Sequence, residues 1–201
     1  MKQADEIVYF MQNTRLIFLR HADTQKDPSI NAAEWGLSEK GKQQAEEASK
    51  LRIMDAVDVI YVSEEPKTSL TVEPLAKRLS EEVQALSAFN EVKRGDKFLT
   101  KEEFEQEKVK QLTDLSYQAF GGETGEQALE RFKKGIDQVV VENTGKTVLI
   151  VTHGTVLNIY FAHLLNANAE LPDRWSKTAF CAVGVIENSE VVQDIISPVK
   201  E

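Results

Sequence analysis

The sequence is poor in cysteine, in long apolar runs and in positive charge at its amino end. Its only cysteine is Cys181, so no disulfide can form within the chain, and a reducing compartment such as the cytoplasm is the expected location. No apolar run approaches the roughly 18 to 20 residues of a membrane span. Asp5 and Glu6 stand where a secretory signal would carry basic residues. These shortages predict a soluble, unexported protein.

Basic residues are outnumbered along the whole chain. There are 24 Lys and Arg against 33 Asp and Glu, which gives a formal net charge of −9. A negative long-range field repels polyanions, and this argues against binding to nucleic acid or to an anionic membrane. A small phosphate-bearing ligand is still compatible with this charge, provided that cationic side chains gather locally around it.

The remaining pattern alternates strands with helices. A chain of 201 residues with 41% hydrophobic residues suits one domain over residues 1–201. Apolar runs typical of buried parallel strands lie at 15–19, 58–62 and 147–151, with a weaker one at 82–86. Helices are expected over 38–51, 65–79, 124–142 and 156–165, and a hairpin over 179–186 and 191–196. Pro74 predicts a kink or a break near Glu73. The order indicates an α/β fold whose sheet is mostly parallel and ends in a hairpin.

Residues 90–122 differ in character from the rest. The stretch is highly charged and holds scattered large apolar residues, and Thr100 with Glu103 forms a capping-box pattern that predicts a helix start. We interpret it as an insertion folded over the site. Lys93 and Arg94 would contact the remainder of a substrate or would be solvated surface charges.

Two of the three histidines follow predicted strands. His21 comes after the run at 15–19, and His153 comes after the run at 147–151. Ligands of open α/β sheets bind beyond the carboxyl ends of the strands, so both rings would face one crevice if these strands are neighbours. His163, inside an apolar helix, is interpreted as structural.

The residues around these histidines carry a family resemblance. Arg20-His21-Ala22-Asp23-Thr24 resembles the Arg-His-Gly signature of the histidine phosphatase superfamily, which includes cofactor-dependent phosphoglycerate mutases and many small phosphatases. Further stretches that agree in order and spacing are 37–45, 63–75, Glu91 in 89–92, and Thr152-His153-Gly154. The similarity spans roughly residues 15–187. It implies a three-layer α/β/α fold like that of phosphoglycerate mutase.

The resemblance also implies catalytic roles. His21 would attack the phosphoryl group and form a phosphohistidine, and surrounding positive charge should keep its ring neutral. His153 would donate a hydrogen bond to the phosphoryl group. Glu91 would protonate the leaving oxygen and then activate water. Glutamates near Glu91 in the sequence are alternatives for this role: Glu64, Glu65, Glu102, Glu103 and Glu123.

The implied substrate-binding residues surround these three. Arg20 would offer a planar fork to two phosphoryl oxygens, and the amides of Gly154 and Thr155 would assist at a helix start. Thr24 would line the site. Lys67 stands where the family usually has a second arginine, and Ala22 where it has the signature glycine. The scheme needs no metal or other cofactor.

The first hypothesis is therefore a metal-independent phosphomonoesterase acting through His21. Lys67 and Ala22 motivate an alternative, a non-catalytic relative that binds a phosphorylated ligand or phosphoprotein. A phosphoglycerate mutase-type phosphotransferase is less favoured because the insertion is small, and a zinc hydrolase lacks His-x-x-x-His spacing. The expected partner is a small phosphorylated metabolite or a phosphoprotein. The Val8-Tyr9-Phe10 patch would dock on the body of the protein or on a second subunit of a homodimer.

Overall fold

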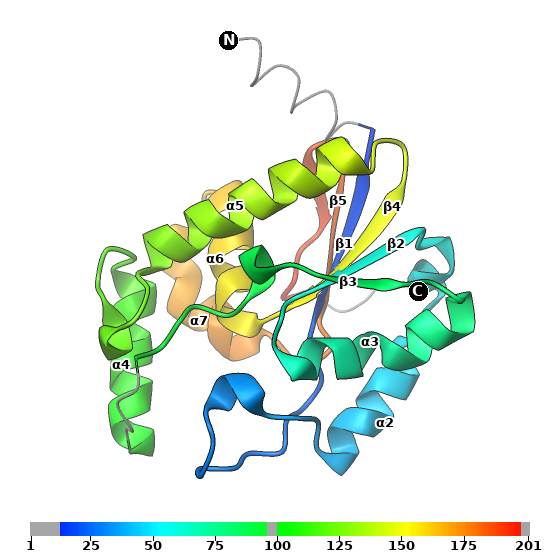
Figure 1. The fold of residues 1–201 in the computed structure, drawn as a ribbon. Coiled ribbons are helices and arrows are strands. Elements are labelled where there is room, and N and C mark those ends of the chain that lie inside the picture. Colours follow the sequence, from blue (N-terminus) through cyan, green and yellow to red (C-terminus); the bar gives the residue numbers. More distant parts are fainter. Residues whose placement is uncertain (1–12, 96–99, 198–201) are drawn as a thin grey trace.

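The computed structural model describes residues 13–95 and 100–197, which form one central sheet flanked by helices (Figure 1). The six strands run in the order β3-β2-β4-β1-β5-β6. Their bounds are β1 Arg15–Arg20, β2 Val59–Val62, β3 Val83–Ala85, β4 Thr147–Thr152, β5 Val183–Glu187 and β6 Glu190–Gln193. The pairs among β3, β2, β4 and β1 are parallel, whereas β5 is antiparallel to both β1 and β6. The mostly parallel sheet with a hairpin at the end is thus confirmed.

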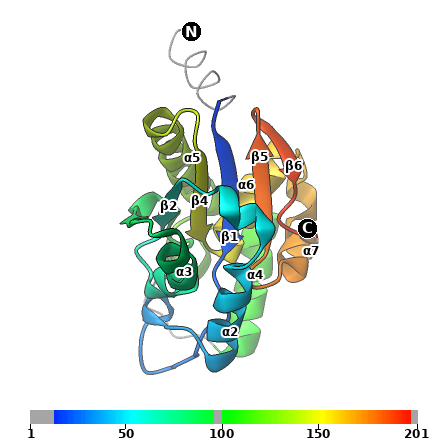
Figure 2. The same cartoon turned by 90° about the vertical axis from the view of Figure 1, so that its right-hand side faces the viewer.

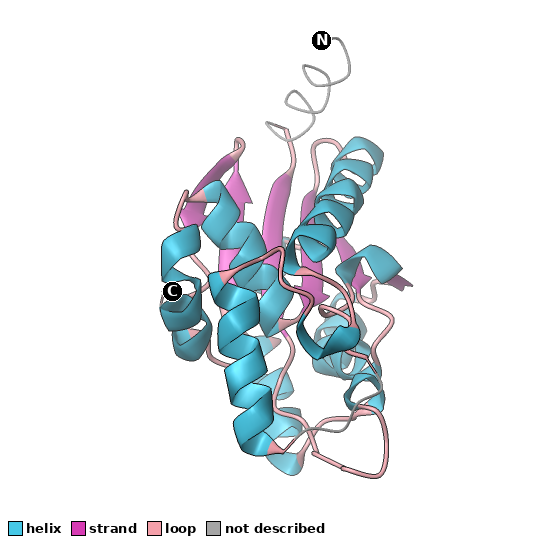
Figure 3. Cartoon of the chain, turned by 90° about the vertical axis from the view of Figure 1, so that its left-hand side faces the viewer, coloured by secondary structure: helices cyan, strands magenta, loops and turns pink. Residues whose placement is uncertain are grey.

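Helices cover both faces of this sheet. Their bounds are α2 Glu39–Ala48, α3 Pro66–Leu79, α4 Lys101–Thr113, α5 Gly125–Glu142, α6 Gly154–Leu164 and α7 Leu171–Lys177. α2 and α3 lie on one side of the strands, while α5 and α6 lie on the other with α4 and α7 next to them (Figures 1 and 2). Figure 3 shows the molecule from the side on which α4 lies, with the helices of that side in front of the strands. The arrangement is the expected three-layer fold.

Each face of β1 packs into its own apolar cluster. Leu16 and Phe18 join the cluster beneath α5 and α6, and Ile17 and Leu19 join the cluster beneath α3. A strand that is buried on both faces has no polar position between its ends, which explains the continuous apolar run in the sequence. The polar residues that follow such a strand are therefore the first that can serve a site.

Most predicted helix starts are confirmed by their caps. Ser38 accepts the N–H of Gly41 at the start of α2, and Thr100 and Thr124 form complete capping boxes at the starts of α4 and α5. At the hairpin turn, Asn188 and Ser189 take the left-handed conformation, with φ of 53° and 66°, as a tight two-residue turn requires.

Two predictions about helices need revision. Of the kink or break predicted near Glu73, the break does not occur: α3 continues through Pro74, because Val72 and Leu75 anchor this turn in the apolar cluster beneath it. His163 is not inside a buried helix, since the buried part of α6 ends at Ala162 and the His163 ring is exposed. α7 was not predicted at all.

One predicted feature concerns residues that the structure does not describe. Val8-Tyr9-Phe10 falls among residues 1–12, which lie outside the described residues. Within residues 13–95 and 100–197, no helix has the length and apolar character to cross a bilayer.

Candidate active site

The sheet brings the first two candidate histidines together. β1 and β4 are adjacent and parallel, with Arg20 in register with Thr152, and the N–H of His21 donates to the Thr152 carbonyl over 2.9 Å. The ring centroids of His21 and His153 lie 5.2 Å apart. The condition that the two strands are neighbours is therefore met, and it brings the two rings together at the ends of β1 and β4.

His21 is held as a single tautomer. Its Nδ1 lies 2.8 Å from the carbonyl oxygen of Ala22. A carbonyl oxygen can only accept, so Nδ1 carries the hydrogen and Nε2 carries a free lone pair. Burial, with the neighbouring His153 and the cations Arg20 and Lys67, lowers the pKa of His21 to about 3. The ring is therefore neutral and nucleophilic at Nε2 near pH 7.

Two helices fix the loop that follows His21. The N–H of Ala22 donates to Thr71 Oγ1 on α3 over 2.9 Å. The N–H of Asp23 donates to Gln44 Oε1 on α2 over 2.9 Å, and Ser38 Oγ donates to Asp23 Oδ2 over 2.6 Å. These contacts explain why the segment 63–75 and the first helix accompany the histidine signature in the sequence.

Thr24 continues this loop. It forms an isolated antiparallel bridge with Leu37 and its side chain is buried. The bridge ties the loop back to the start of α2, while a contact of Thr24 with substrate stays a prediction.

Arg20 lies against the start of α6. Its Nη1 donates to the Thr178 carbonyl, and its guanidinium carbon stands 4.4 Å from the centre of the Phe180 ring. A Cβ added to Gly154 would stand 2.9 Å from Arg20 Nε, so the glycine makes room for the guanidinium. Thr178 and Phe180 follow α7 and have no signal in the sequence that would have assigned them to the site.

Lys67 is buried, with 5% of its surface exposed, and its ammonium is already paired. Nζ donates to Glu65 Oε2 and to the Ala32 carbonyl, each over 2.6 Å. The Lys67 ammonium thus forms an ion pair with the carboxylate of Glu65, two residues earlier in the chain.

His153 faces the same carboxylate. Its Nε2 lies 2.8 Å from Ser63 Oγ and 3.4 Å from Glu65 Oε1. Burial lowers the pKa of His153 to about 3. The Glu91 carboxylate acts in the opposite direction and raises this pKa, while the cations Lys67 and Arg20 lower it further. His153 is accordingly neutral near pH 7, and Ser63 adds a site residue from the end of β2.

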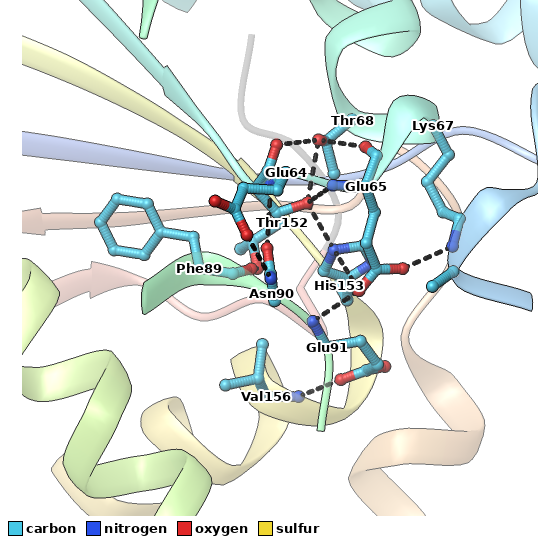
Figure 4. A network of polar contacts seen from close by, with 12 residues as sticks. Glu64, Glu65, Lys67, Thr68, Phe89, Asn90, Glu91, Thr152, His153 and Val156 are labelled. Carbon is cyan, nitrogen blue, oxygen red and sulfur yellow. Dashed lines mark hydrogen bonds and ion pairs between the residues drawn. The ribbon is translucent and has the colours of Figure 1, made fainter. Parts of the chain in front are cut away.

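Glu91 is bound to the first turn of α6 (Figure 4). Oε2 accepts the N–H of Thr155, and Oε1 accepts the N–H groups of Val156 and Val92, each over 3.0 Å. Burial alone would raise the pKa of this carboxyl, but His153, Lys108 and these N–H groups together hold it well below its usual range. The idea that the Thr155 amide assists a phosphoryl group needs correction, because that N–H is donated to Glu91.

The alternative glutamates separate clearly by their contacts. Glu65 contacts His153 and Lys67 and also accepts the N–H of Glu91 over 2.9 Å. Glu103 caps α4, and Glu123 pairs with Arg131 over 2.7 Å. Of these three, Glu65 is the one that stands between groups of the site.

The predicted insertion reaches the site through α4. Lys108 is buried and its Nζ donates to Thr155 Oγ1 over 3.1 Å and to Gln111 Oε1 over 2.8 Å. Arg94 is exposed, and its guanidinium carbon stands 4.6 Å from the centre of the Phe104 ring. Within the described parts of the chain, no three His, Cys, Asp or Glu side chains form a group that could hold a metal ion.

Comparison with known proteins agrees with this geometry. The family model described as "Histidine phosphatase superfamily (branch 1)" matches residues 16–195. No curated protein matches the chain.

Solved structures share the fold at low identity. A mycobacterial glucosyl-3-phosphoglycerate phosphatase in complex with VO3 is 20% identical with a TM-score of 0.74, over 88% of this chain and 94% of that one. A phosphoserine phosphatase mutant from Entamoeba histolytica, in complex with phosphoserine, is also 20% identical with a TM-score of 0.73, over 90% and 94%.

Proposed function

The chain belongs to the histidine phosphatase superfamily (branch 1), and we propose that it hydrolyses phosphate monoesters through a phosphohistidine formed at Nε2 of His21. Membership gives phosphatase as the enzyme class. The observation that carries the proposal is the contact of His21 Nδ1 with the Ala22 carbonyl, which leaves Nε2 unprotonated beside His153.

The surrounding donors suit a phosphoryl group. Its transfer needs fixed positive groups around the non-bridging oxygens and an attacking atom in line with the leaving oxygen. Arg20 supplies the guanidinium, His153 a ring N–H, and Lys67 an ammonium once its pairing with Glu65 is exchanged for the phosphoryl oxygens. The Thr155 N–H donates to Glu91, so of the two predicted amides only that of Gly154 would assist the phosphoryl group, and Gly154 also leaves room for the Arg20 guanidinium.

A small phosphorylated metabolite is the substrate class that we favour over a phosphoprotein. The two structural neighbours are named for a phosphorylated glucosylglycerate and for phosphoserine, which supports a compact substrate. Cys181 is a free thiol, in keeping with a cytoplasmic location.

One observation favours a second candidate function, a non-catalytic relative that binds phosphorylated ligands. Glu65 already neutralises Lys67 within the site. If that ion pair persists when ligand binds, the site lacks one cation for turnover.

Hydrolysis of para-nitrophenyl phosphate in the presence of a chelator tests the proposal. We expect activity in the wild type and in His163→Ala, which changes an exposed histidine of α6. Replacing His21 by Ala should lower the rate by about 1,000-fold or more, because the nucleophile is lost. Acid quenching of the wild type should trap an acid-labile phosphohistidine that the His21→Ala variant lacks.

Other outcomes identify the alternatives. Vanadate binding without any turnover would support the binding relative. Activity that disappears with chelator would point to a zinc hydrolase, and phosphoryl exchange between two phosphoglycerate isomers would point to a mutase. An active His21→Ala variant would refute the phosphohistidine.

A further inference from the structure

We propose that Arg94 and Lys108 form a second anion subsite, which binds a carboxylate carried by the alcohol part of the substrate. The inference rests on the proposed function, because the subsite serves the ester that His21 attacks. It narrows the substrate class to phosphate monoesters of small hydroxy acids. Both cations come from the stretch 90–122, which the sequence predicts to fold over the site.

The Arg94 guanidinium lacks an ionic partner. Within residues 13–95 and 100–197 it forms no hydrogen bond or ion pair, and its carbon stands 4.6 Å from the centre of the Phe104 ring. Although part of the residue is exposed, burial of the guanidinium lowers the pKa of Arg94, and the charges of Glu91 and Glu65 raise it. Both carboxylates belong to the site, so the guanidinium lies beside the site with its N–H donors available to a ligand.

The backbone on both sides of Arg94 is fixed. The N–H of Gly95 donates to the Phe120 carbonyl over 3.0 Å, and the N–H of Glu123 donates to the Lys93 carbonyl over 3.0 Å. The start and the end of the insertion are therefore joined at the residues that flank Arg94. A side chain on a fixed backbone loses less entropy when it binds a ligand.

Two stacked aromatic rings place both cations. The centroids of Phe104 and Phe120 lie 5.3 Å apart, and Lys108 Nζ stands 5.3 Å from the centre of the Phe120 ring. Phe120 adopts a left-handed φ of 59°, which is uncommon for a bulky residue and occurs chiefly at binding and active sites. An aromatic face attracts a cation without neutralising it. Arg94 and Lys108 thus keep their charge for a ligand.

Lys108 is a buried cation without a carboxylate partner among the described residues. It is 2% exposed, and its Nζ donates only to the neutral acceptors Thr155 and Gln111, which leaves one of its three N–H groups unused. Gln111 Nε2 is also buried and has no partner in the same part of the chain. Burial lowers the pKa of Lys108 to about 7, which Glu91 opposes and Arg94 reinforces. A lysine is rarely buried unpaired, and a bound anion would supply the missing charge.

The position of these cations corresponds to the alcohol side of the ester. Thr155 connects the two sides, because its N–H donates to Glu91 and its Oγ1 accepts from Lys108. In an in-line transfer the leaving oxygen points away from His21. Glu91 is the carboxyl group predicted to protonate that oxygen. The alcohol would therefore extend past Glu91 towards Arg94 and Lys108.

A carboxylate suits this subsite better than a second phosphate. The planar guanidinium fork of Arg94 matches the two oxygens of a carboxylate. Glu91 and Glu65 already act on Arg94 with two negative charges, so a second dianion would meet stronger repulsion than a monoanion. A neutral alcohol would leave both cations unpaired. A singly charged carboxylate satisfies both conditions.

The experiment measures kcat/KM for two matched pairs of esters. Phosphoglycolate is compared with its carboxamide, and phosphoglycerate with glycerol phosphate, so that the members of each pair differ chiefly in the carboxylate. We expect the wild type to prefer the carboxylate member by about 10- to 100-fold, as for a charge-assisted hydrogen bond. Arg94→Gln and Lys108→Met should each lose most of this preference, and Arg94→Lys should keep part of it. A purely structural role would lower both members of a pair equally.

The adjacent Lys93 supplies the matched control. It is exposed and carries the same charge, but the cation over the Phe104 ring is that of Arg94. Lys93→Gln should keep the wild-type preference for the carboxylate. An equal loss in Lys93→Gln and Arg94→Gln would assign the preference to the general positive field and overturn the subsite.

The remaining outcomes separate the subsite from the proposed function. Equal kcat/KM for both members of each pair in the wild type overturns the subsite, and so does turnover of para-nitrophenyl phosphate alone. A preference for propanediol bisphosphate over phosphoglycerate overturns the choice of a carboxylate. If Lys108→Met does not fold, the exposed Arg94 keeps the test. Absence of turnover with every ester refutes the proposed function, and the subsite with it.

Discussion

The position of the Arg20 guanidinium depends on the absence of a side chain at Gly154. A Cβ at Gly154 would stand 2.9 Å from Arg20 Nε and 3.0 Å from Cζ, so Gly154→Ala should push the guanidinium from its place. Loss of one charge-assisted hydrogen bond to the ligand, about 1.5–2 kcal/mol, weakens vanadate binding roughly 10- to 30-fold. Calorimetric titration with vanadate measures the effect.

A matched glycine provides the control for this variant. Gly36→Ala would bring its Cβ within 3.7 Å of a Leu70 methyl group, an ordinary contact, and should bind vanadate like the wild type. Equal affinity in Gly154→Ala would mean that Arg20 does not need this space for anion binding.

Single residues of the site were predictable where chain position alone decides their place. His21 and His153 follow buried strands, and the end of a strand fixes where the next side chain stands. Glu65 was only one of several glutamates, because its contacts with Lys67 and His153 depend on the direction that the first turn of α3 gives its carboxylate. The acceptor for His21 is a backbone carbonyl of Ala22, which carries no signature in the sequence.

At the scale of elements, α2 must approach the loop that follows His21 very closely. A Cβ at Gly41 would stand 2.0 Å from the Asp23 carbonyl oxygen. Gly→Ala inside a helix normally stabilises by about 1 kcal/mol, so a destabilised Gly41→Ala variant would report the clash itself. We expect a loss of about 1–3 kcal/mol in urea unfolding, together with reduced activity, since α2 must move away from Asp23.

The exposed Gln43, two residues further along α2, supplies the comparison. Gln43→Ala should leave both stability and turnover near the wild-type values. A Gly41→Ala variant as stable as the wild type would show that α2 can shift without disturbing the site.

Elements with a cap or a strong apolar period were predictable, and short ones were not. The capping boxes at Thr100 and Thr124 begin α4 and α5 where expected. α7 spans only Leu171–Lys177, too short for a period, and it is fixed by a long-range pairing of the buried Arg174 with Asp194 at 2.6 Å. Pro74 shows the opposite case, in which packing of α3 outweighs a local helix breaker.

At the scale of the whole molecule, the strand order assembles the site. β4 lies between β2 and β1, so the residues after three neighbouring strands, Ser63, His153 and His21, meet at one edge of the sheet. The sequence placed two of them there only on condition that their strands are neighbours. That condition depends on pairing between segments more than 100 residues apart, which local patterns do not encode.

The same convergence makes folding stability depend on pH. His21 and His153 have pKa values of about 3 in the folded protein, against an ordinary value of 6.5, so the unfolded chain binds more protons between these limits. Stability should therefore be full above about pH 6.5 and fall as the pH drops towards 3, with a slope approaching 1.4 kcal/mol per pH unit for each ring. Urea unfolding between pH 6.5 and 5 measures this slope before most carboxylates titrate. Replacing His21 by Asn should roughly halve it, whereas His163→Asn, at an exposed ring, should change it far less; an unchanged slope in His21→Asn would mean that the His21 ring is protonated in the fold.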